Sequence, residues 1–264
     1  MSEAGILFII GIIAGVMAGM FGIGGGVVMV PSLIAVMQYS LVQANGTSLA
    51  ALMMPVGIFA VIAYKKNDLL DVKVAIVLAF GLLLGVLFGA KLALSLPTNI
   101  LKQLYGGFLL WICWRFFEMT DILKRRFKFE LNISKQEIES QEIKMPLPLL
   151  IVFGIFAGVL SGLFGIGGGL VMVPIMITFM HFNPKKAVGT SLGALLLPVA
   201  FPGVLMYYKA GQLNIPAAAM LAIGLVLGSI IGAKITITLP APIIKKVYAL
   251  FLLVMGLQFI ISEF

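Results

Sequence analysis

The stretch Gly22-Ile23-Gly24-Gly25-Gly26-Val27-Val28-Met29-Val30-Pro31 occurs twice in this chain, returning as Gly165-Ile166-Gly167-Gly168-Gly169-Leu170-Val171-Met172-Val173-Pro174. The second copy lies 143 residues after the first (165 − 22 = 143), and nine of the ten positions are identical. Other matches keep this offset: Gly46-Thr47-Ser48-Leu49 with Gly189-Thr190-Ser191-Leu192, Gly89-Ala90-Lys91 with Gly232-Ala233-Lys234, and Tyr64 with Tyr207. Two apolar copies that each carry a glycine break are typical of transporters, whose binding site lies between the repeats.

The composition is that of a membrane protein. Of 264 residues, 61% are hydrophobic and 11% are charged, and the mean hydropathy is +1.16. Soluble domains carry about 25% charged residues. Apolar stretches long enough to span a bilayer occupy 46–64, 72–96, 188–207 and 215–239, and the stretches at 100–114 and 243–261 complete the set. The net charge of +8 lies between these spans, which favours a positive-inside distribution over nucleic-acid binding.

One long polar stretch divides the chain. Residues 115–146 carry alternating basic and acidic side chains, which favour a solvated helix or a flexible tether. We therefore expect a first membrane unit at 1–114, a charged cytoplasmic linker at 115–146 and a second membrane unit at 147–264.

Each repeat opens with a long apolar segment, 5–38 or 148–180, which the glycines interrupt near its middle. Glycine in a helix interior costs about 1 kcal/mol relative to alanine. An unbroken helix of this length would also measure about 50 Å, which exceeds the hydrocarbon core. The sequence therefore predicts two shorter helices that meet at the glycines, either as a hairpin or as a broken span.

The loop charges predict how the two repeats are oriented. Segment 65–73 carries three lysines and its counterpart 208–216 carries one, whereas segment 39–45 carries none and its counterpart 182–188 carries two. This reversal indicates opposite orientation in the membrane. The expected fold is an all-α polytopic membrane protein with two inverted-topology repeats, each a glycine-broken helical hairpin plus three transmembrane helices. Both termini lie outside in this arrangement, and a parallel pair of four-span repeats is the alternative.

The glycine breaks are the candidate binding site. The unpaired N–H groups and positive dipole end of a helix that begins inside the membrane favour an anion, and glycine lets a ligand approach the main chain. The alternative is close helix packing, to which we assign Gly11, Gly15 and Gly19 and also Gly81, Gly85 and Gly89. The candidate substrate-binding glycines are Gly22, Gly24, Gly25, Gly26, Gly165, Gly167, Gly168 and Gly169.

Two repeated hydroxyl pairs complete the candidate site. Thr47 with Ser48, and Thr190 with Ser191, follow a glycine at the expected start of a span. Their hydroxyls either cap backbone N–H groups there or donate to the ligand. For Lys91 and Lys234, each near an interface, snorkelling is the default interpretation.

The chain lacks the residues that other functions need. Cys113 is the only cysteine and His181 the only histidine, so we expect no metal site and no cofactor. No carboxylate lies inside an expected span, which argues against a cation carrier and against an intramembrane enzyme.

The repeated pattern Gly-x-x-Ala-Gly-x-x-x-Gly-x-Phe-Gly-Ile-Gly-Gly-Gly-x-Val-Met-Val-Pro runs from Gly11 to Pro31 and again from Gly154 to Pro174. It resembles the TauE/SafE sulfite exporter family, also called the toluene-sulfonate-uptake-type anion permeases. The likeness covers nearly the whole chain except the linker. It implies a multi-pass protein of the prokaryotic inner membrane that carries sulfite, organosulfonates or related anions.

Together these observations predict a secondary transporter, with export as the expected direction, for a small sulfur-containing anion such as sulfite or an organosulfonate. One repeat rocks against the other to give alternating access. Its expected partners are the anion and the lipid bilayer, with no nucleic acid, and a homo-oligomer remains open. An anion channel and a non-transporting membrane scaffold or assembly protein are the alternatives.

Overall fold

The computed structural model describes residues 2–55, 57–111 and 145–238. Within these residues the ordered elements are helices and there is no strand, which confirms the predicted all-helical class. The helices are α1 (Glu3–Phe21), α2 (Gly26–Met37), α3 (Leu41–Met53), α4 (Ile58–Lys66), α5 (Val72–Ser95), α7 (Leu147–Phe164), α8 (Gly169–Phe179), α9 (Pro184–Leu196), α10 (Phe201–Lys209) and α11 (Ile215–Thr238). The expected linker lies almost entirely, and the span expected at 243–261 wholly, outside the described residues.

The chain divides into two compact units. One combines Met1–Leu96 with Glu142–Thr238, and the other combines Pro97–Gln141 with Leu239–Phe264. Of the second unit only residues 97–111 are described, and residues 98–111 are helical. The first unit contains α1–α5 and α7–α11 and therefore holds most of both repeats.

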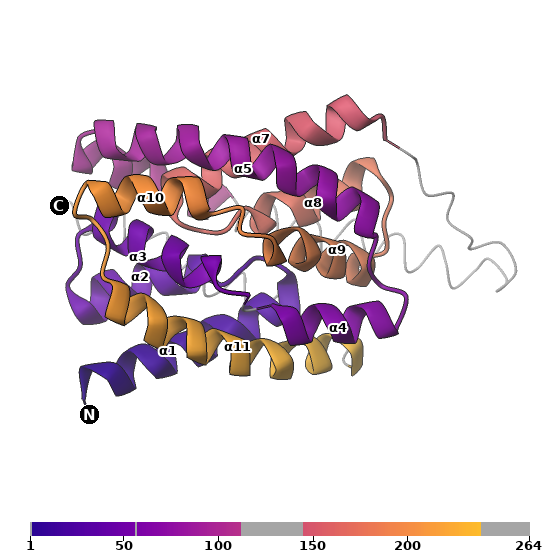
Figure 1. The fold of residues 1–264 in the computed structure, drawn as a ribbon, viewed down its shortest axis with the longest axis horizontal. Coiled ribbons are helices and arrows are strands. Elements are labelled where there is room, and N and C mark those ends of the chain that lie inside the picture. The colour runs from indigo at the N-terminus through magenta and orange to yellow at the C-terminus, as the bar shows by residue number, and fades with distance from the viewer. Residues whose placement is uncertain (1, 56, 112–144, 239–264) are drawn as a thin grey trace, which may run out of the picture. The chain divides into compact units, whose positions relative to one another are not determined.

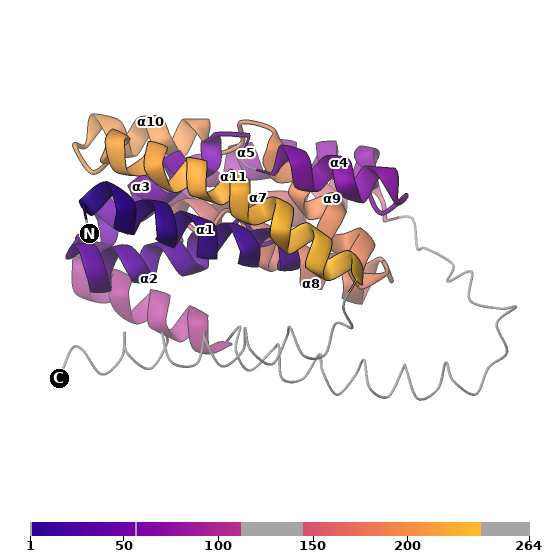
Figure 2. The ribbon, with the colours of Figure 1, turned by 90° about the horizontal axis from the view of Figure 1, so that it is seen from below.

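Each glycine break separates two helices, as predicted. The first helix of each copy ends at a glycine with a left-handed conformation, Gly22 (φ 70°) after α1 and Gly165 (φ 67°) after α7. The chain starts a new helix at Gly26 and again at Gly169. In Figures 1 and 2, α2 turns back toward the end of the bundle at which α1 begins.

Four helices of the described residues, α1, α5, α7 and α11, are long and apolar enough to cross a membrane. Two more spans result if each bent pair, α3 with α4 and α9 with α10, is one span, since both pairs bend by 51°. The spans expected at 72–96 and 215–239 are therefore confirmed as α5 and α11. Those expected at 46–64 and 188–207 begin earlier, with α3 and α9. Each of them is bent, because Pro55 and Pro198 disfavour helix in the preceding residue.

The long helices pack across the two repeats. The first helix of each copy packs on the long helix of the other, α1 on α11 and α7 on α5. The contact is close: a Cβ atom at Gly15 would overlap the backbone oxygen of Leu225, and one at Gly228 would overlap that of Ile12. The same holds for α5 and α7. The glycines that we assigned to packing (Gly11, Gly15, Gly19, Gly81, Gly85 and Gly89) lie in these rows, which confirms that prediction.

Equivalent helices of the two copies run in opposite directions through the bundle. In Figure 1, α1 begins at the left and α7 at the right, while α5 runs from right to left and α11 from left to right. The turn between α4 and α5 therefore lies at the opposite end of the bundle from the turn between α10 and α11, and Figure 2 agrees.

Candidate functional site

The two glycine breaks touch each other at the level of the backbone. A Cβ atom on Gly26 would lie 2.6 Å from Ile166 Cα, and one on Gly169 would lie 2.9 Å from Ile23 Cα. No side chain fits into such spacing, so both positions require glycine. The remaining glycines of the breaks have the left-handed backbone that favours glycine: Gly24 (φ 83°), Gly25 (φ 87°), Gly167 (φ 84°) and Gly168 (φ 74°).

The starts of α2 and α8 carry unpaired backbone donors. The first N–H group of α2 with a backbone acceptor is that of Val28, which donates to Gly25 O at 3.0 Å. In α8 it is that of Val171, which donates to Gly168 O at 3.1 Å. Among the described residues, the preceding N–H groups of residues 24–27 and 167–170 have no backbone acceptor. Two positive helix ends thus meet at one place, where an anion would be stabilised.

The two repeated serines hold these breaks across the repeats. Ser48 Oγ donates to Gly165 O at 2.8 Å, and Ser191 Oγ donates to Gly22 O at 2.7 Å. Both side chains are fully buried. The structure therefore brings each predicted serine to the glycine break of the other copy.

The expectation that these hydroxyl pairs begin a span is wrong. Helix α3 begins at Leu41, where Ser40 Oγ accepts from Gln43 N, and α9 begins at Pro184, so the Thr-Ser pairs lie inside helices. The reason is that polar Ser40 and Asn183 act as the N-caps, several residues before the glycines.

The two threonines contact other helix starts instead of the breaks. Thr47 Oγ1 accepts from the backbone N–H of Asn214 at 3.1 Å, and Thr190 Oγ1 accepts from that of Asp71 at 3.0 Å. Asn214 and Asp71 directly precede α11 and α5. Each threonine therefore positions the long helix of one copy against α3 or α9 of the other.

Two tyrosines that the sequence analysis left without a role also belong to the site. Tyr64 OH donates to Gly19 O at 3.0 Å, and Tyr207 OH donates to Gly162 O at 2.8 Å. Both are fully buried. They satisfy carbonyl groups in the last turn of α1 and α7, which the break leaves without helical partners. Their repetition at the constant offset was the available signal.

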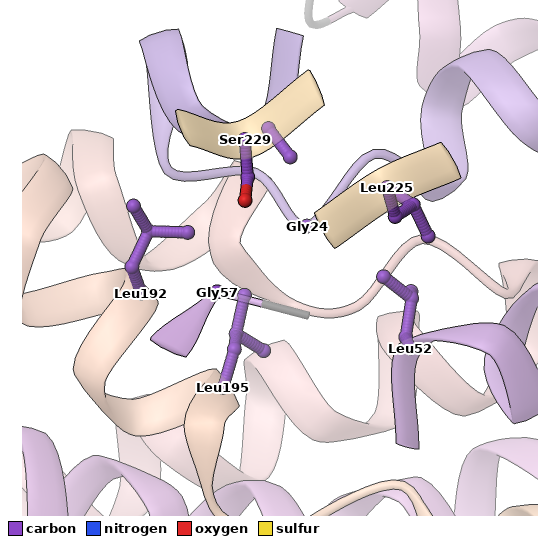
Figure 3. A pocket seen from close by; sticks show the side chains of 8 residues that line it. Gly24, Leu52, Gly57, Leu192, Leu195, Leu225 and Ser229 are labelled. Atoms are coloured by element: carbon purple, nitrogen blue, oxygen red, sulfur yellow. The ribbon is translucent and has the colours of Figure 1, made fainter. Parts of the chain in front are cut away.

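A small cavity of about 20 Å³ adjoins one break. Gly24 lines it together with Leu52, Leu192, Leu195 and Ser229, among others, and Figure 3 shows the Ser229 hydroxyl directed into it. This space holds about one water molecule. Leucine side chains cover the breaks here, since Leu195 Cδ1 would lie 3.3 Å from a Cβ on Gly24 and Leu52 Cδ1 2.9 Å from one on Gly167.

The charged side chains of the described residues lie elsewhere. Lys91 and Lys234 are exposed on α5 and α11, which is consistent with a position at a membrane interface. The described carboxylates are those of Glu3, Asp68 and Asp71, at the amino terminus and beside the turn between α4 and α5. Backbone dipoles and neutral hydroxyl groups therefore dominate the electrostatics of the breaks.

Apolar helices of spanning length around a pair of broken helices define a polytopic membrane protein of the transporter class. Residues 7–259 match the family described as Sulfite exporter TauE/SafE, and the chain belongs to that family. Members of this family are transporters and not enzymes.

Relatives of similar length carry matching descriptions. The chain is 29% identical to the probable membrane transporter protein YunE of Bacillus subtilis, over 97% of this chain and 96% of that protein. It is 29% identical to a probable membrane transporter protein of Methanocaldococcus jannaschii, over 96% and 93%, and 28% identical to YdhB of Bacillus subtilis, over 91% and 92%. No solved structure matches the chain.

Proposed function

We propose that this protein is a secondary transporter of a small sulfur-containing anion such as sulfite or an organosulfonate, located in a prokaryotic inner membrane. The observation that carries the proposal is the meeting of the α2 and α8 starts, where the N–H groups of residues 24–27 and 167–170 have no backbone acceptor among the described residues. Backbone N–H groups at helix starts bind oxyanions without a compensating side-chain charge. The family description favours sulfite among small anions.

The proposed ligand site consists of the two breaks and the serines that hold them. Glycine at these positions allows the anion to approach the main chain, while Thr47 and Thr190 have a positioning role through α11 and α5. The proposed contacts are Gly24, Gly25, Gly26, Gly167, Gly168 and Gly169. Gly22, Gly165, Ser48 and Ser191 shape the site, because the N–H groups of the two glycines donate to Ala18 O and Ser161 O and their carbonyl groups accept from the two serines.

We further propose that the repeats are inverted in the membrane, with units at 1–114 and 147–264 joined by a cytoplasmic linker. The opposite directions of α1 and α7 in Figure 1 support this arrangement. So do the reversed lysine counts of segments 65–73 and 208–216.

We propose that transport proceeds by alternating access, and the contacts between the breaks support this mechanism. In the structure Leu52 and Leu195 pack against the glycines, and the adjoining cavity holds about one water molecule. Binding of a larger oxyanion requires these leucines to move away from the breaks. Movement of one repeat against the other changes the paired bonds of Ser48 and Ser191 together, because each bond joins the two copies.

The test is sulfite flux into liposomes that contain only the purified chain. A transporter gives saturable flux that taurine or sulfoacetate reduces by competition. Flux that rises linearly with sulfite concentration indicates a channel, and flux no greater than that of empty liposomes indicates a scaffold or assembly protein.

A further inference from the structure

One buried oxygen at the end of α7 has no hydrogen-bond donor among the described residues. It is Oδ1 of Asn45, whose side chain is 0% exposed. The amide nitrogen of the same side chain donates to Leu163 O at 2.9 Å. This bond fixes the orientation of the amide, because only the nitrogen can donate to a carbonyl. A buried polar atom of this kind calls for an explanation, and an unseen water molecule or ion supplies one.

In the other copy, the equivalent carbonyl group is hydrogen-bonded without an amide oxygen being left over. Leu163 corresponds to Met20, whose carbonyl oxygen accepts from Thr236 Oγ1 at 3.0 Å. Val188 occupies the position equivalent to Asn45, and Ala93 the position equivalent to Thr236. The carbonyl groups of Met20 and Leu163 are thus satisfied by different side chains from different helices, and of these two sides only that of α7 carries a buried side-chain oxygen without a hydrogen-bond partner.

The carbonyl groups on the α7 side of this oxygen favour a positive charge. The last turn of α7 is the negative end of its dipole. Its carbonyl groups accept from neutral side chains, so these partners supply no positive charge. These pairs are Gly162 with Tyr207, Leu163 with Asn45, and Gly165 with Ser48. Each carbonyl oxygen has a second lone pair. The result is an oxygen-rich, buried cluster next to the glycine break.

We propose that this cluster binds a sodium ion through Asn45 Oδ1 and the carbonyl oxygens of Gly162 and Leu163. Carbonyl groups at the end of a broken helix coordinate Na⁺ in transporters that are built from repeats. The cluster lies beside Gly165, whose Cβ position falls 2.7 Å from Asn45 Cα. As a coupling site it rests on the proposed function, since the ion would order one break while the anion binds between both.

Sodium binding can be measured without any transport substrate. Thermal unfolding of the purified chain in detergent is compared in sodium, potassium and choline chloride at equal concentration. Because a ligand that prefers the folded state raises its stability, we expect a higher melting temperature in sodium chloride than in the other two salts. Identical curves in the three salts would overturn the proposal, while leaving the anion-transport proposal intact.

A paired variant separates the site from the fold. In Asn45→Val with Ala93→Thr, the α7 side takes the arrangement of the α1 side, so that a threonine serves Leu163 O and the extra oxygen is lost. We expect apparent sodium affinity to fall at least about tenfold. If this variant does not fold, Asn45→Ala alone removes the amide oxygen without adding a hydroxyl oxygen, and its sodium-dependent shift is measured in the same way.

The matched control makes the reverse exchange in the other copy, Val188→Asn with Thr236→Ala, and leaves Asn45 in place. It keeps the sodium-dependent shift. A folded Asn45 variant that also keeps the full shift places sodium elsewhere and overturns the proposal.

Discussion

The hydroxyl of Ser48 donates a 2.8 Å hydrogen bond to the carbonyl oxygen of Gly165, although the two residues lie 117 positions apart and belong to different copies of the repeat. Ser191 and Gly22 form the corresponding bond at 2.7 Å. Each copy therefore holds the glycine break of the other. In each copy, one carbonyl group of the break therefore depends on a hydroxyl group from the other copy.

Replacing Ser48 by alanine leaves the buried carbonyl of Gly165 without its donor. We expect a loss of about 0.5–2 kcal/mol of stability, because hydrogen bonds inside membrane proteins contribute modestly, and a similar loss for Ser191→Ala. Thermal unfolding in detergent measures both. The control is Ser95→Ala, since Ser95 is exposed and donates only to Leu92 O of its own helix. Equal stability of all three variants would contradict a role of the serines in holding the breaks.

Gly24 and Gly211 offer a matched pair for testing the site. Both have positive φ, 83° and 68°, so alanine strains the backbone at either position by about 1–2 kcal/mol. At Gly24 the new methyl group would also lie 3.3 Å from Leu195 Cδ1, whereas at Gly211 nothing lies within 4 Å. We expect Gly24→Ala to reduce sulfite flux several-fold more than Gly211→Ala. Equal flux in the two variants would show that Gly24 is not part of the transport pathway.

The repeat at constant offset was sufficient to predict the helical class, the broken first helices and the glycine rows. The reason is that glycine acts on the backbone through its lack of a side chain, which is known from the sequence alone. The helix starts at Leu41 and Pro184 were missed, because the Gly-Thr-Ser triplet itself resembles a helix start. The packing of each first helix on the long helix of the other copy could not be predicted, since the partner of a helix depends on tertiary packing. Asn45 and Thr236 were missed as well, because each has an apolar counterpart in the other copy.

The tyrosine that closes the last turn of α7 has an exposed neighbour that serves as its control. Tyr207 is buried and donates to Gly162 O, whereas Tyr208 is 59% exposed. Tyr207→Phe removes only the hydroxyl, so we expect a loss of about 1 kcal/mol, and Tyr208→Phe should leave stability unchanged. Thermal unfolding under identical conditions compares them. Equal melting temperatures would show that Gly162 O finds another donor.

The turn residues Asp68 and Gly211 occupy equivalent positions in the two copies, and labelling at these positions tests how the repeats are oriented. Both are exposed and both have positive φ. They lie in turns at opposite ends of the bundle, between α4 and α5 and between α10 and α11. Single cysteines are introduced at each position after the native Cys113 is replaced by serine.

Inverted repeats place these two cysteines on opposite sides of the membrane. The lysine-rich segment 65–73 is expected inside. A membrane-impermeant thiol reagent applied to intact cells should therefore label Gly211→Cys, and should label Asp68→Cys only after permeabilisation. Parallel repeats would place both cysteines on the same side, so that the two variants would be labelled under the same conditions. That result would overturn the proposed inverted architecture.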